Sequence, residues 1–160
     1  MPYLIEAAVA LVVVILQVIL SNFIMLLGGI PDLALIFVVW TVLKRGQLAG
    51  ELVGFGLGLL IDILASGTPG AHALTYTIVG FLLGYFSNAE QSEQRLRNWP
   101  FLLFVFLGSV VNNSIYFLLF TSGSGISFTD FLMGRGGLAT LYTTLIAVAP
   151  MIYWSRRPLY

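Results

Sequence analysis

The feature that most constrains this chain is the length of its apolar stretches, which are separated by short polar turns. The first covers residues 3–27, about 25 residues, and its one charged side chain is Glu6 near the start. At a helical rise of about 1.5 Å per residue, this stretch is longer than the ~30 Å hydrocarbon core of a bilayer. Strands of a transmembrane barrel alternate apolar and polar side chains, and the apolar stretches contain no such alternation. They therefore predict membrane-spanning helices.

Composition indicates the same class. Of the 160 residues, 59% are hydrophobic and only 9% are charged, against roughly 25% charged residues in soluble domains. We therefore predict a single integral membrane domain over residues 1–160, an all-α polytopic helix bundle. The formal net charge is zero and there is no basic tract, which argues against a nucleic-acid partner. The chain has no cysteine, which excludes disulfides and thiolate metal sites.

Six apolar stretches are candidate spans, at residues 3–27, 31–43, 48–65, 71–86, 99–120 and 130–154. The second is short, because its about 13 residues reach only roughly 20 Å as a helix. It is either a short buried span or a re-entrant segment, which gives six or five spans. We favour six, because this stretch is apolar and ends at the basic turn Lys44-Arg45.

Basic side chains are distributed unequally between the two ends of these spans. One end holds Lys44, Arg45, Arg95, Arg97, Arg156 and Arg157, and the other holds Arg135. By the positive-inside rule, the basic loops and the C-terminus are cytoplasmic. The N-terminus is cytoplasmic with six spans and lies outside with five.

A glycine pattern marks the third and fourth stretches. In the third, Gly50, Gly54 and Gly58 are spaced by four and fall on one helical face with Asp62; in the fourth, Gly80 and Gly84 repeat the spacing. In lipid, small residues at this spacing let helices approach closely. The pattern predicts either packing within the bundle or docking of a partner helix.

Asp62 is the strongest single candidate for a functional residue. A carboxylate within an apolar helix is costly in lipid, so we expect it to face inward or towards an aqueous pocket. Asp32, His72 and Arg135 fall near the same, outer end of the spans. A buried charge usually has a partner, so the hypothesis here is an ion pair between Asp62 and Arg135, with helix capping as the alternative.

Other polar residues give little support for catalysis. Asn112 and Asn113 lie in the middle of the fifth stretch, and adjacent helical positions point about 100° apart, so we expect interhelical hydrogen bonds to different neighbours. With one histidine and no cysteine, neither a metal site nor a cofactor is predicted. A hydrolytic set of Asp62, His72 and Ser66 is the weakest alternative.

The residues from 29 to 86 carry a family resemblance. Pro31-Asp32 is followed by an apolar run, then by the series Gly54-Phe55-x-x-Gly58-x-x-x-Asp62-Ile63 and a small-residue loop with Gly67 and Gly70. This order resembles the MreD family, the rod-shape-determining proteins of the bacterial inner membrane.

The resemblance implies a non-enzymatic component of the peptidoglycan elongation machinery. Members pair with MreC, and they are linked more indirectly to RodA, its transpeptidase and the MreB cytoskeleton. The family also resembles in fold the substrate-binding subunits of energy-coupling-factor transporters, which gives the alternative function.

That transporter class often carries an Ala-xxx-Ala stripe on its first span. The stripe is missing here, because Ala7, Ala8 and Ala10 are followed one turn later by Leu11, Val12 and Val14. A ligand pocket of a transporter would need convergent polar groups at the outer face, which Asp32, His72 and Arg135 would supply.

Overall fold

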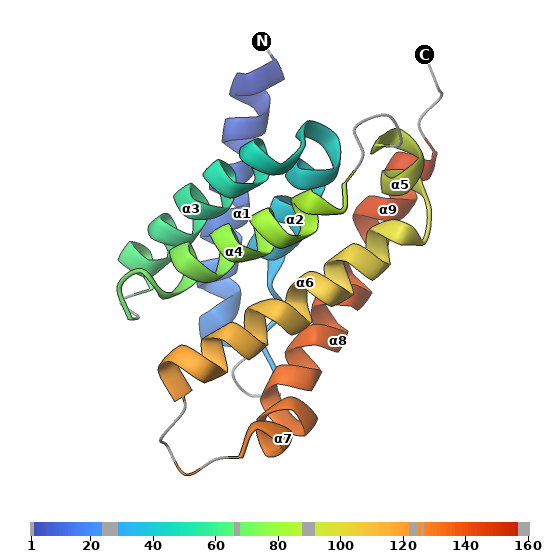
Figure 1. Cartoon of the computed structure of the whole chain (residues 1–160). Helices are drawn as coiled ribbons and strands as arrows, with labels where there is room; N and C mark the ends of the chain where they lie inside the picture. Colours follow the sequence, from blue (N-terminus) through green and yellow to red (C-terminus); the bar gives the residue numbers. More distant parts are fainter. Residues whose placement is uncertain are drawn as a thin grey trace.

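The computed structural model describes residues 2–23, 29–65, 68–87, 92–121, 125 and 127–156, and all regular elements in these ranges are helices (Figure 1). In chain order they are α1 (Pro2–Phe23), α2 (Leu33–Arg45), α3 (Gln47–Leu64), α4 (Ala71–Tyr85), α5 (Ser92–Arg97), α6 (Pro100–Tyr116), the π-helical η3 (Phe117–Thr121), α7 (Phe128–Phe131), the π-helical η4 (Leu132–Gly136), α8 (Gly137–Ile146) and α9 (Val148–Ser155).

The predicted all-helical class is confirmed, and the helices fall on the predicted apolar stretches. Within the described residues, four helical segments are long and apolar enough to cross a membrane: Leu4–Ser21, Gln47–Leu64, Pro100–Leu119 and Phe128–Ser155. The helices α2 and α4 are shorter, with 13 and 15 residues. The predicted polar connection 87–98 contains a short helix, α5, that the sequence did not indicate.

The helix α2 forms the centre of the bundle. It contacts α1, α3, α4, α5, α6 and α8. Its side chains are buried on every face, at Ala34, Leu35, Ile36 and from Val38 to Leu43. A helix that is apolar all round requires neighbours on all sides, which explains this central place. Among the described side chains of α1, by contrast, only Val14 and Gln17 are buried.

The glycines of α3 and α4 face each other in one close contact, and the two helices lie side by side in Figure 1. A methyl group on Gly54 would lie 2.7 Å from the carbonyl oxygen of Tyr76, and one on Gly80 would lie 2.9 Å from the carbonyl carbon of Gly50. We call this region the glycine contact; its members are Gly50, Gly54, Gly58, Gly80 and Gly84.

The glycine contact lies inside the chain. Gly58 meets the backbone of His72 and Ala73, Gly84 meets Gln47, and Gly50 meets Val42 of α2. The Gly50–Gly54–Gly58 face is therefore covered within the chain by α4 and α2. Backbones approach this closely only where no side chain intervenes.

The last predicted span is interrupted rather than continuous. Gly134 has non-helical backbone angles (φ −98°, ψ −113°) and produces a kink inside η4. A second break separates α8 from α9 after Ile146. Pro150 accounts for it, because proline has no N–H to donate to the carbonyl of Ile146 and its ring collides with that carbonyl.

Charged groups from distant parts of the chain gather at one end of the bundle. Glu6 of α1 forms ion pairs with Lys44, at 3.2 Å, and with Arg45. Arg97 of α5 donates to the carbonyl oxygen of Ser155, at 3.0 Å. We call this end, with Lys44, Arg45 and Arg97, the basic pole, and α1 begins and α9 ends on its side of the molecule in Figure 1.

Candidate functional site

The carboxylate of Asp62 caps the beginning of α4. It accepts hydrogen bonds from the backbone N–H groups of His72 and Ala73, each at 3.2 Å, and it lies 2.7 Å from Nδ1 of His72. The first N–H groups of a helix have no partner within the helix, and a carboxylate there also interacts favourably with the helix dipole. Because Gly70 at the N-cap position provides no side chain, Asp62 of α3 supplies the cap.

Asp32 caps its own helix and collects two further donors. Its Oδ1 accepts from the backbone N–H of Leu35 at 2.9 Å and from the hydroxyl of Tyr76 at 2.7 Å. Its Oδ2 accepts from Nδ2 of Asn112 at 3.3 Å. The backbone N–H of Asp32 donates to Oγ1 of Thr143 at 2.9 Å. One residue at the start of α2 therefore binds side chains of α4, α6 and α8.

These residues form a connected group that we call the acid cluster: Asp32, Asp62, His72, Tyr76 and Asn112. The ring of His72 lies 5.8 Å from that of Tyr76 and 6.0 Å from that of Tyr116, measured between centroids. The side chain of Asp62 is 2% exposed, whereas that of His72 is 32% exposed. His72 thus connects a buried carboxylate to the surface.

Gln17 extends the polar contacts to α1. Its Nε2 donates to the carbonyl oxygen of Pro31 at 3.1 Å, and its Oε1 accepts from the N–H of Leu33 at 2.8 Å. The side-chain amide thereby binds both backbone groups of the break before α2. Tyr76 and Thr143 were not selected from the sequence. Tyr76 had a usable signal, because it lies four residues after His72 on the same helical face.

Asn113 belongs to a separate polar contact between α6 and α8. Its Nδ2 lies 3.1 Å from Oγ1 of Thr140 and 3.3 Å from the carbonyl oxygen of Gly136. Ser109 joins them through Oγ1 of Thr140 at 3.3 Å. The adjacent asparagines therefore have different partners, Asn112 on α2 and Asn113 on α8.

The hypothesis of an ion pair between Asp62 and Arg135 is wrong. The partners of Asp62 are His72 and the backbone of α4, whereas Arg135 lies in η4 with an exposed side chain. The backbone N–H groups of His72 and Ala73, at the start of α4, donate to the carboxylate of Asp62. The buried carboxylate therefore does not need a distant cation as its partner.

Hydrogen bonds join the polar side chains of the acid cluster. Within the described residues, no group of three His, Cys, Asp or Glu side chains could hold a metal ion. Ser66, the third member of the hydrolytic alternative, lies outside the described residues. What the described geometry provides is two carboxylates that accept hydrogen bonds from helix N-termini.

Comparison with protein families gives one match. A model described as rod shape-determining protein MreD matches residues 1–156, which is nearly the whole chain. The chain belongs to the MreD family. Comparison with curated proteins and with solved structures gave no match. Membership connects this helical membrane protein to rod shape determination.

In this MreD protein, the residues that carried the resemblance occupy structural positions. Asp32 and Asp62 each cap a helix, and Gly54 and Gly58 lie in the glycine contact. Gly70 has φ +83°, a left-handed conformation that glycine adopts at no steric cost. The motif therefore describes how α2, α3 and α4 fit together.

Proposed function

We propose that this MreD protein is a non-enzymatic membrane scaffold of the cell-elongation complex that makes peptidoglycan, and that it binds MreC directly. The observation that supports this proposal is the structural role of the motif residues. Asp32 and Asp62 cap helices, and the glycines allow the backbones of α3 and α4 to approach closely. Residues whose hydrogen bonds and contacts stabilise the fold are better suited to a rigid binding scaffold than to an active site. RodA with its transpeptidase and MreB are then indirect or weaker partners.

We further propose six membrane crossings, with both termini and the basic pole in the cytoplasm. The ion pairs of Glu6 with Lys44 and Arg45 support this arrangement, because they hold the start of α1 beside the end of α2. An even number of crossings returns the chain to the side on which it began. The excess of basic residues at this pole favours the cytoplasmic side of a bacterial inner membrane.

Affinity purification tests the partner directly. The tagged protein would be extracted from native membranes in a mild detergent, and co-purifying proteins would be identified by mass spectrometry. We expect MreC, with or without RodA and its transpeptidase. An unrelated multi-pass membrane protein with the same tag is the control for background. Recovery without MreC, at normal levels of the tagged protein, would contradict direct binding.

A second measurement separates loss of the partner from loss of the protein. Leu at Gly54 is expected to reduce the amount of the tagged protein itself, because the added side chain would clash with the backbone of Tyr76 on α4. A Cβ at Gly56 on the same helix meets no atom within 4 Å, so Leu at this position should leave the amounts of both the protein and MreC unchanged. The ratio of MreC to tagged protein is therefore the quantity to report.

The alternative is a substrate-binding subunit of an energy-coupling-factor-type transporter. Convergent polar groups in the acid cluster, with the partly exposed His72, are the observation that favours it. Against it, the carboxylates of Asp32 and Asp62 already accept hydrogen bonds within the bundle. Co-purification of paired ATPases and a coupling subunit would favour this alternative, and uptake assays would follow.

A further inference from the structure

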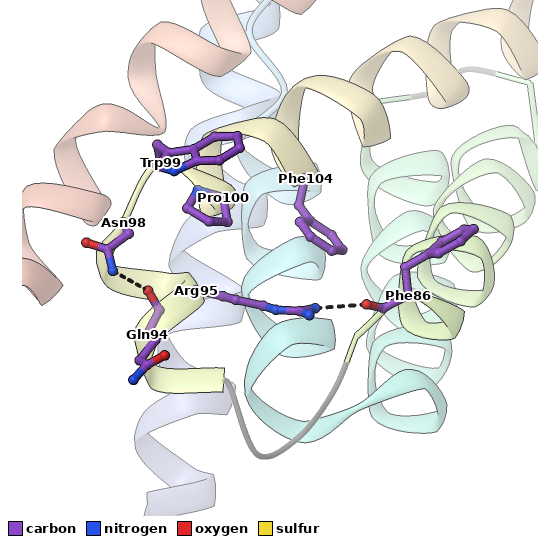
Figure 2. A pocket seen from close by; sticks show the side chains of 7 residues that line it. All are labelled: Phe86, Gln94, Arg95, Asn98, Trp99, Pro100 and Phe104. Atoms are coloured by element: carbon purple, nitrogen blue, oxygen red, sulfur yellow. Dashed lines mark hydrogen bonds between the residues drawn. The ribbon is translucent and has the colours of Figure 1, made fainter.

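A pocket of about 490 Å³ opens near the basic pole, between the end of α4, the helix α5 and the start of α6 (Figure 2). Its aromatic walls are Phe86, Trp99 and Phe104, and its polar side chains are Gln94, Arg95 and Asn98. The volume is in the range of small-molecule sites, roughly 300–1,000 Å³.

Arg95 is fixed in position across this pocket. Its Nη1 donates to the carbonyl oxygen of Phe86 at 2.8 Å, and its guanidinium carbon lies 5.7 Å from the centre of the Phe104 ring. Figure 2 shows the side chain extended from α5 towards the end of α4. A guanidinium held against an aromatic face is pre-organised, and its planar set of donors matches a phosphate.

The pocket combines this cation with an apolar rim. Trp99 is 69% exposed and Phe86 is 66% exposed. Tryptophan side chains at the ends of membrane helices are enriched at the headgroup level of the bilayer. Lys44 and Arg45, which share the single carboxylate of Glu6, and Arg97 belong to the same pole, so the basic charges there outnumber that acid. Basic pockets between membrane helices on the cytoplasmic side suit anionic lipid headgroups.

We infer that this pocket binds one anionic phospholipid, with the headgroup phosphate at Arg95 and the first part of an acyl chain along Phe104 and Phe86. Gln94 and Asn98 border the headgroup on the side of α5. Only the choice of leaflet rests on the proposed topology, which places the pocket in the cytoplasmic leaflet. Binding itself follows from the pocket and does not depend on MreC.

The test uses the full chain, stripped of lipid in detergent, with phosphatidylglycerol as the probe. Native mass spectrometry measures the bound fraction as the lipid concentration is raised. Arg95→Gln is expected to weaken binding at least about fivefold, equivalent to about 1 kcal/mol. Arg156→Gln removes the same charge at the same end without lining the pocket, so its affinity should stay within about twofold of the unchanged protein.

Two further arms define the ligand. Phosphatidylcholine should bind at least about fivefold more weakly than phosphatidylglycerol, and soluble glycerol phosphate should compete poorly, since it lacks the acyl chains. Equal binding of both lipids, or equal binding of the soluble phosphate, would overturn the inference. Unchanged affinity in Arg95→Gln would overturn it as well.

A second variant covers the case in which Arg95→Gln does not fold. Gln94 is exposed and lines the pocket, so Gln94→Glu adds a negative charge with little change in shape. Weaker binding of phosphatidylglycerol supports the inference, and unchanged binding refutes it. In native membranes, a photoreactive side chain at Trp99 should crosslink to lipid; capture of a polypeptide would assign the pocket to a protein instead. MreC recovery, measured separately, reports on the scaffold proposal alone.

Discussion

The glycine contact brings the backbones of α3 and α4 together, whereas the acid cluster joins α2, α3, α4 and α6 through hydrogen bonds. Lipid tails are as apolar as leucine, so apolar burial gives helices little reason to associate within a membrane. Close packing and buried polar contacts hold the helices together instead. Close packing depends on side-chain size, and polar contacts depend on hydrogen-bonding groups. Different substitutions should therefore disrupt the glycine contact and the acid cluster.

The largest expected effect is Gly58→Leu in the glycine contact. A side chain there would enter the backbone of His72 and Ala73, which cannot rotate away, so we expect a loss of about 3 kcal/mol or more in the free energy of unfolding. The measurement is the yield of monodisperse protein and its melting temperature in detergent. Gly56→Leu on the open face of α3 is the matched control and should behave as the unchanged protein. Equal loss in both variants would contradict the size argument.

Asp32→Ala should have the next largest effect. It removes the acceptor for the backbone N–H of Leu35, the hydroxyl of Tyr76 and the amide of Asn112. We expect a loss of about 2–4 kcal/mol in the free energy of unfolding. Asp32→Asn retains one acceptor oxygen and should lose less. If Asp32→Ala and the unchanged protein unfolded at the same denaturant concentration, these hydrogen bonds would not stabilise the bundle.

The smallest expected effect is a coupling energy within the acid cluster. In a double-mutant cycle, Asp62→Ala and His72→Ala should be coupled by about 0.5–1 kcal/mol, because the two side chains are in contact. The matched cycle of Asp62→Ala with Arg135→Gln should be additive within about 0.5 kcal/mol. The free energies of unfolding of the single and double variants give both values. Coupling to Arg135 in place of His72 would restore the ion-pair hypothesis.

The same contrast explains what the sequence could predict. The glycine spacing of four is a local pattern, and the helices that carry it are neighbours in the chain, so close packing was predictable. The positions of the long helices were also predictable, because apolar stretches are a local feature of the sequence. Pro150 was an available signal for the break after Ile146, but hydropathy alone indicated one continuous span.

The acid cluster was only partly predictable. Asp32, Asp62 and His72 could be assigned to one end of the spans, but the side-chain partners of Asp32 come from helices that are far from it in the chain. A shared depth in the membrane selected Arg135 as the partner of Asp62. The backbone donors at the start of α4 were the better match, and the glycine at its N-cap position was the signal for them.

The central helix α2 has a consequence for how the protein enters the membrane. With 13 residues it reaches roughly 20 Å, less than the ~30 Å hydrocarbon core, so it is a weak insertion signal by itself. Its termini are held by Asp32 at one end and by the pairs of Glu6 with Lys44 and Arg45 at the other. During synthesis, α2 is therefore expected to leave the translocon as a hairpin with α1, and the later arrival of α3, α4, α5, α6 and α8 completes its surroundings.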